Sequence, residues 1–210
     1  MIGTHQFVLF LTASAVLAAT PGPGMLYVLS RTLAGGRREG VMSSLGTFLG
    51  GMVHVVAAAA GLSVVLATSA LAFSAVKFAG AAYLIYLGTR MVLSAKKDAE
   101  SEGISIQRKK GSPLLQGFVT EALNPKTALF FLSFIPQFVP RHSPHVFYYF
   151  LLLGLISVTL NTTGDLVAIL LADPLKKLFT RSPRARVNQK RTSGAVMIAL
   201  GAYVAVSDSH

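Results

Sequence analysis

Apolar residues follow one another in five long stretches of the chain, separated by short polar or charged segments. These stretches are Phe7–Ser30, Val41–Leu66, Leu71–Leu93, Leu114–Val139 and Val146–Ala172. Each has the length of about 20 apolar residues that a helix needs to cross a bilayer. A sixth stretch, Gly194–Val206, is shorter and spans only with help from its polar flanks or from local thinning. The pattern predicts an all-α, polytopic membrane helix bundle of six spans, with five spans as the alternative.

Basic residues gather in the segments that follow the first, third and fifth stretches. Together with Arg90, at the end of the third stretch, those three segments hold 16 of the 19 Lys and Arg residues. Cytoplasmic loops of membrane proteins carry such an excess of positive charge. The odd-to-even loops are therefore expected in the cytoplasm, with the N-terminus outside. The net charge of +11 then reflects topology, and no nucleic-acid partner is expected.

The charged segment 95–113 divides the chain into two halves, residues 1–94 and 114–210, within what we expect to be a single transmembrane domain. We expect this segment to be a cytoplasmic linker. Three spans in each half would give the halves opposite orientations, which is the arrangement of an inverted-topology repeat. An offset of 104 residues places Pro21 on Pro125 and supports two inverted three-helix halves.

Two apolar stretches are interrupted at matching places in the two halves, by "TPGPG" in the first and by "NPK" in the fourth. Proline lacks an N–H group, so each break frees backbone polar groups inside the membrane. Free backbone is tolerated there only where protein or a water-filled cavity satisfies it, and paired breaks of this kind mark transporter binding sites. Helix restarts also offer N–H groups and a positive dipole end to a carboxylate. The expected substrate-binding residues are Pro21, Gly22, Pro23, Gly24, Asn124, Pro125 and Lys126.

Ionisable residues inside the spans are few, and their cost in lipid makes them functional candidates. Glu121, Asp165 and His54 are the candidates for proton coupling. Glu121 has the best position, one helical turn before Pro125. It could carry a proton or pair with a cationic substrate group, and a structural salt bridge with Lys126 is the alternative.

Two rows of residues at helical spacing belong to the predicted interior. Ser157, Asn161 and Asp165 form a polar stripe that is expected to face the bundle. Gly46 and Gly50 form a small-residue motif for close helix packing, and His54 continues the same face.

The spacing of polar residues does not favour an enzyme. Nucleophile, phosphate-loop and H-E-x-x-H motifs are absent from the sequence, and we expect neither a metal nor a cofactor. A structural or scaffolding membrane protein and, less favoured, an intramembrane hydrolase are the alternatives to a transporter.

Four segments together resemble the LysE/RhtB family of amino-acid exporters: "ATPGPGMLYVLSRTLAGGRREG", "GTFLGG", "KFAGAAYLIYLGTRM" and "LNPKTALFFLSFIPQFV". The resemblance implies a secondary active exporter of amino acids or their derivatives in the bacterial inner membrane, driven by protons through alternating access. Its partners would be amino acids, protons and membrane lipid, and a homo-oligomer is left open. Some members carry an Asp where this chain has Gly51, so their substrate range does not transfer directly.

Overall fold

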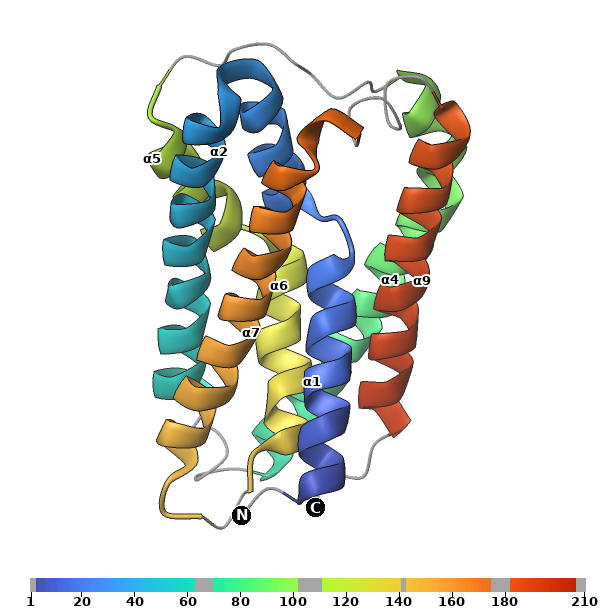
Figure 1. Cartoon of the computed structure of the whole chain (residues 1–210). Coiled ribbons are helices and arrows are strands. Elements are labelled where there is room, and N and C mark those ends of the chain that lie inside the picture. The colour runs from blue at the N-terminus through green and yellow to red at the C-terminus, as the bar shows by residue number, and fades with distance from the viewer. Residues whose placement is uncertain (1–2, 63–69, 102–110, 141–142, 175–181, 207–210) are drawn as a thin grey trace.

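The chain folds into a bundle of helices that run alternately up and down along one axis (Figure 1). The structure is a computed structural model that describes residues 3–62, 70–101, 111–140, 143–174 and 182–206. Within these ranges every regular element is helical. The predicted all-α membrane bundle is therefore confirmed.

The first half contains the first broken span and a helical hairpin. Helix α1 (Thr4–Ala19) stops near mid-depth, and α2 (Pro23–Ala57) continues in the same direction after three non-helical residues (Figure 1). Helix α2 then reverses at Gly36, whose φ of 80° is a left-handed conformation that favours glycine. A π-helical turn, η1 (Ala58–Leu62), extends the descending arm, and α4 (Ala70–Ser101) climbs back.

The second half repeats the broken span in the opposite direction. Helix α5 (Pro113–Ala122) descends to mid-depth and α6 (Pro125–Leu129) continues the descent, followed by η2 (Phe130–Phe134) and η3 (Ile135–Phe138). Helix α7 (Val146–Leu170) then rises and α9 (Pro183–Val206) descends beside α4 (Figure 1). Helix α1 begins and α9 ends at the same end of the bundle.

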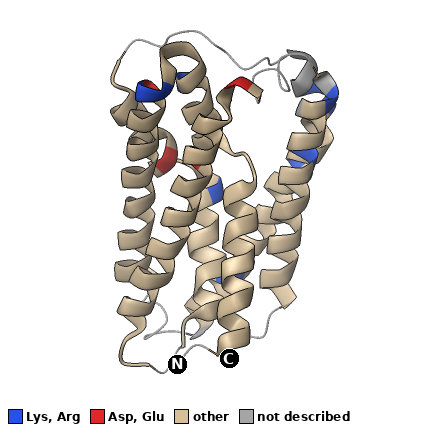
Figure 2. Cartoon of the chain, viewed as in Figure 1, with Lys and Arg blue, Asp and Glu red and all other residues tan. Residues whose placement is uncertain are grey.

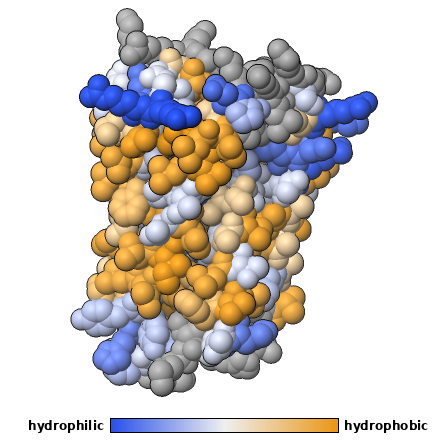
Figure 3. Space-filling model, in the orientation of Figure 1, coloured by the Kyte–Doolittle hydropathy of each residue, from blue (hydrophilic) through white to orange (hydrophobic). Residues whose placement is uncertain are grey.

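The outer surface has the pattern of a membrane protein. The stretches Pro23–Leu62, Leu71–Lys97 and Val146–Leu170 are long and apolar enough to cross a membrane, and Thr4–Ala19 is a shorter apolar helix. In the view of Figure 3, hydrophobic side chains cover the middle of the bundle and hydrophilic ones lie at its ends. Most of the described Lys and Arg residues lie at the end opposite the start of α1 (Figure 2).

Two predicted boundaries were wrong, both because polar residues that favour helix were assigned to loops. Helix α4 continues to Ser101, past the predicted start of the linker at Ala95, because Ala and Lys are strong helix formers. Helix α9 begins at Pro183 rather than at Gly194, and at 1.5 Å per residue it is roughly 36 Å long. Glycine lets it pack closely on α4, since a Cβ at Gly194 would lie 2.5 Å from the Gly88 carbonyl oxygen.

Two different clusters close the bundle above and below its centre. At the end where α1 begins, Phe10, Phe134, Phe138 and Phe150 are buried in one aromatic core. At the other end, the buried Arg31 pairs with Glu39 across the hairpin at 3.2 Å and also donates to the Gly111 carbonyl and the Gln116 side chain. The two helix breaks lie between these clusters.

Candidate functional site

The two helix breaks lie against each other, although about 100 residues separate them in the chain. A Cβ atom placed on Gly22 would lie 3.1 Å from Lys126 Cδ and 3.3 Å from its Nζ. A Cβ on Gly24 would overlap the Glu121 carboxylate. A side chain at Gly24 would therefore displace the Glu121 carboxylate, whereas one at Gly22 would press on the flexible end of Lys126.

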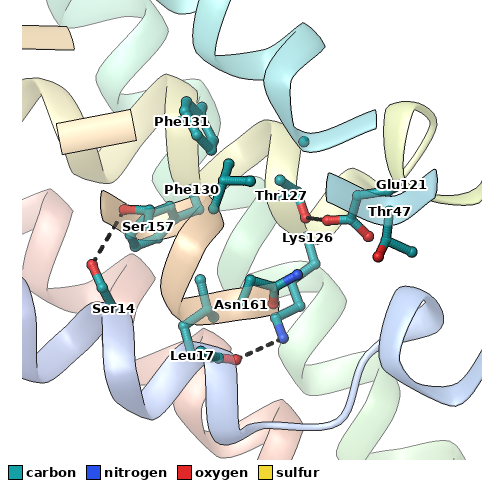
Figure 4. A pocket seen from close by; sticks show the side chains of 13 residues that line it. Ser14, Leu17, Thr47, Glu121, Lys126, Thr127, Phe130, Phe131, Ser157 and Asn161 are labelled. Atoms are coloured by element: carbon teal, nitrogen blue, oxygen red, sulfur yellow. Dashed lines mark hydrogen bonds between the residues drawn. The ribbon is translucent and has the colours of Figure 1, made fainter. Parts of the chain in front are cut away.

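Backbone carbonyls freed by the first break are bound by side chains from other spans. Lys126 Nζ donates to the Leu17 carbonyl at 2.9 Å (Figure 4) and to the Thr20 carbonyl at 2.7 Å, both at the C-terminal end of α1. A positive charge is favourable at this negative end of the helix dipole. Gln189 Nε2 and Ser193 Oγ of α9 each donate to the Pro21 carbonyl at 3.2 Å. The break is thus held by side chains of α6 and α9.

The second break is held by its own polar residues and by His54. Asn124 caps α6 by accepting from the Lys126 N–H (3.0 Å), and its Nδ2 donates to Glu121 Oε2 (3.0 Å). Thr127 Oγ1 donates to the other carboxylate oxygen at 2.5 Å. His54 Nε2 lies 3.0 Å from the backbone carbonyl oxygen of Glu121, so it contacts the freed backbone.

The structure contradicts one alternative for this region and limits one expectation. The proposed salt bridge between Glu121 and Lys126 is not formed, because the carboxylate is taken by Asn124 and Thr127 and the ammonium by α1 carbonyls. The N–H groups of the second restart are not all free for a substrate, since the Asn124 side chain binds that of Lys126. At the start of α2, by contrast, the N-cap residue is Gly22, which has no side chain to bind the first N–H groups of the helix.

A cavity of about 30 Å³ lies where the breaks meet, with room for about one water molecule (Figure 4). Glu121 and Lys126 both border it, together with Thr127. The apolar part of the wall comes from Leu17, Ala18, Gly51, Phe130, Phe131 and Val158, and the remaining polar part from Ser14, Thr47, Ser157 and Asn161. The site thus combines an acidic and a basic side chain with hydroxyl and amide groups and with an aliphatic and aromatic surface.

The polar stripe of α7 faces this interior, as the sequence predicted. Asn161 borders the cavity, and Ser157 borders it with its hydroxyl 3.4 Å from that of Ser14 on α1. Asp165 is fully buried and is hydrogen-bonded to Thr47 through Oδ2 at 2.8 Å.

Gly46 and Gly50 hold α2 tightly against α5. A Cβ on Gly46 would overlap the Leu114 carbonyl, and one on Gly50 would lie 2.5 Å from the Phe118 carbonyl oxygen. Gly51, next to them, faces α7, where a Cβ would lie 3.1 Å from the methyl carbons of Val158. A longer side chain at Gly51 would therefore reach the cavity wall.

The sequence did not point to Gln189 or Ser193, because they lie in the basic segment before the sixth apolar stretch. If they position the first break, replacing Ser193 by Ala and Gln189 by Leu together should slow transport several-fold, since each hydrogen bond contributes about 1 kcal/mol. Uptake into vesicles at matched protein levels measures this, and the neighbouring exposed Thr192→Ala is the control. Equal rates for the double variant and the control would show that the contact is dispensable.

Comparison with known proteins assigns the chain to a family. The family model described as LysE type translocator matches residues 15–208, nearly the whole chain. The chain belongs to this family. It is 29% identical to the uncharacterised membrane protein YrhP of Bacillus subtilis, over 97% of this chain and all of the relative.

Two further relatives extend the comparison. A leucine efflux protein of Salmonella typhimurium is 29% identical over 79% of this chain and 75% of its own. An uncharacterised membrane protein of Vibrio cholerae is 27% identical over 97% of this chain and 98% of its own. No solved structure matches the sequence. The resemblance stated from the motifs is thus confirmed, and the chain is a multi-pass membrane protein of a translocator family.

Proposed function

We propose that the protein exports amino acids across the bacterial inner membrane by alternating access, driven by the proton gradient. The observation that carries the proposal is that Lys126 and Glu121 border one cavity at the two helix breaks without pairing with each other. An α-amino acid brings one carboxylate and one ammonium group. The two side chains match those charges in a region of the protein where unpaired charges are costly.

In this proposal the substrate carboxylate binds Lys126 and its ammonium group binds Glu121. Each of these side chains already has hydrogen-bond partners, so the substrate joins a preorganised network rather than building one. Leu17, Phe130, Phe131 and Val158 offer an apolar surface to the substrate side chain. This surface suits an aliphatic amino acid, in agreement with the leucine efflux relative.

A cavity of about 30 Å³ holds about one water molecule and is too small for an amino acid. Binding therefore requires the surrounding helices to move apart, as alternating access demands. The basic end of the bundle faces the cytoplasm in this proposal, following the positive-inside rule. Substrate would enter from the side of the Arg31–Glu39 cluster and leave past the aromatic core.

The test is counterflow of radiolabelled leucine into proteoliposomes that contain the purified protein and excess unlabelled leucine. We expect labelled leucine to accumulate transiently and unlabelled leucine to compete. The competitors that matter are 4-methylpentanoate, which lacks the ammonium group, and 3-methylbutylamine, which lacks the carboxylate. Both should compete at least about tenfold less well, because each leaves one buried charge without its partner. If either competes as well as leucine, recognition of both charges is contradicted.

A further inference from the structure

Asp165 is buried near the C-terminal end of α7, and one of its two carboxylate oxygens has no hydrogen-bond partner among the described residues. Its exposed fraction is 0%, and its Oδ2 atom lies 2.8 Å from Thr47 Oγ1. Within the described part of the chain, Oδ1 has no hydrogen-bond partner and no basic side chain forms an ion pair with Asp165. An ionised carboxylate is costly in such surroundings, whereas a protonated one is neutral.

A second unpartnered polar atom lies on the helix face opposite Asp165. The descending arm of α2 faces α7, because Cβ atoms on Gly40 and Gly51 would contact Ile169 and Val158. Ser44 lies on that same face, one turn from Gly40 and one turn from Thr47. Its hydroxyl is buried and, among the described residues, makes no hydrogen bond.

The Thr47 hydroxyl has two hydrogen-bond acceptors within reach, one on its own helix and one on Asp165. Its hydroxyl oxygen lies 2.9 Å from the Ser44 carbonyl and 2.8 Å from Asp165 Oδ2. A threonine hydroxyl has one proton and can donate to only one of them at a time. A hydrogen bond donated by Thr47 suits an ionised Asp165. When Thr47 donates to its own helix instead, a protonated Asp165 can donate to the Thr47 hydroxyl oxygen.

Glu121 differs from Asp165 because both of its carboxylate oxygens have hydrogen-bond partners. Both of its carboxylate oxygens accept hydrogen bonds, from Asn124 and from Thr127, as an ionised carboxylate does. The sequence placed Glu121 first among the proton-coupling candidates, and the geometry ranks Asp165 above it. The charged groups that act on Asp165 are Glu121 on α5 and Lys126 on α6, while α2 presents the hydroxyls of Ser44 and Thr47.

We propose that Asp165 binds the coupling proton, with Thr47 as the positioning residue whose hydroxyl contacts its carboxylate. Thr47 also borders the substrate cavity, and its methyl carbon lies 3.6 Å from where a Cβ on Gly24 would be. Turning of the Thr47 hydroxyl therefore links the proton on Asp165 to the first helix break. The inference rests on the proposed export function for its direction: the proton enters from outside and is released inside as substrate leaves.

The test separates gradient-driven transport from exchange in proteoliposomes. Asp165→Asn should lower leucine accumulation driven by a pH gradient by about tenfold or more, the size of a typical coupling energy, while leucine–leucine exchange stays within about twofold of wild type. Asp173→Asn is the matched control, because Asp173 is exposed and lies just after the end of α7. It should change neither the gradient-driven accumulation nor the exchange of leucine. Thr47→Val should shift the pH at which accumulation is half-maximal, because it removes the hydroxyl that distinguishes the two states.

Three outcomes would overturn the inference: full gradient-driven accumulation by Asp165→Asn, equal loss of exchange and accumulation in a monodisperse variant, or dependence on sodium instead of protons. A measurement that needs no substrate tests protonation of Asp165 independently of the proposed export function. Infrared difference spectra on titrating the purified protein should contain the carbonyl band of a protonated carboxyl, absent in Asp165→Asn. If the wild-type protein does not exchange leucine, the proposed export function is contradicted. If the infrared band is unchanged in Asp165→Asn, the assignment of the proton to Asp165 is contradicted.

Discussion

Replacing Lys126 by Met is expected to reduce leucine transport by about 10- to 100-fold, because the substrate carboxylate would lose a charge-assisted partner. The same change leaves two carbonyls at the C-terminal end of α1, those of Leu17 and Thr20, without the donor that now binds both. Under the proposed function, Lys126 would bind the substrate in addition to the carbonyls of the helix break. We expect the loss to affect exchange and gradient-driven transport alike, which distinguishes Lys126 from Asp165.

Initial rates of labelled leucine uptake at several concentrations measure this effect. Lys96→Met, at an exposed position on α4, is the matched control and should transport as the wild type does. Lys126→Arg keeps the charge and should retain binding better than Met, although a planar guanidinium fits the two carbonyls differently. Wild-type rates for Lys126→Met would exclude the ammonium from substrate binding.

The paired breaks were predictable from the sequence because proline and glycine act locally. Pro23 and Pro125 each start a helix at its first turn, where a missing N–H group costs nothing. These two helix-starting prolines are 102 residues apart, two fewer than the offset of 104 that places Pro21 on Pro125. Apolar side chains carried too little information to fix that offset.

The partners of the breaks could not be predicted, because they come from spans distant in the sequence. Which carbonyls Lys126 would bind depends on how α6 packs against α1, and Gln189 reaches Pro21 only because α9 begins earlier than its apolar pattern. The choice between Glu121 and Asp165 likewise rested on hydrogen bonds across helices. Sequence periodicity indicates which face is interior, and the packing decides which atoms remain unpartnered.

Gly24→Ala is expected to inactivate transport at near-normal expression. The new methyl group would occupy the position of Glu121 Oε2, with Thr47 on its other side. Overpacking of this kind costs about 1–3 kcal/mol, which the protein can relieve by turning Glu121 away from the cavity. A displaced carboxylate no longer meets the substrate ammonium, so the leucine transport rate should fall by about tenfold or more.

Gly61→Ala is the matched control, because a Cβ on Gly61 meets nothing within 4 Å. Gly22→Ala should have a smaller effect than Gly24→Ala, since the atoms in its way belong to the flexible end of Lys126. A second change gives the sharper test. Glu121→Asp shortens the side chain by one carbon, and it should partly restore transport in the Gly24→Ala protein while lowering it in the wild type. If the double variant transports no better than Gly24→Ala alone, contact with Glu121 is not the reason that position 24 must be glycine.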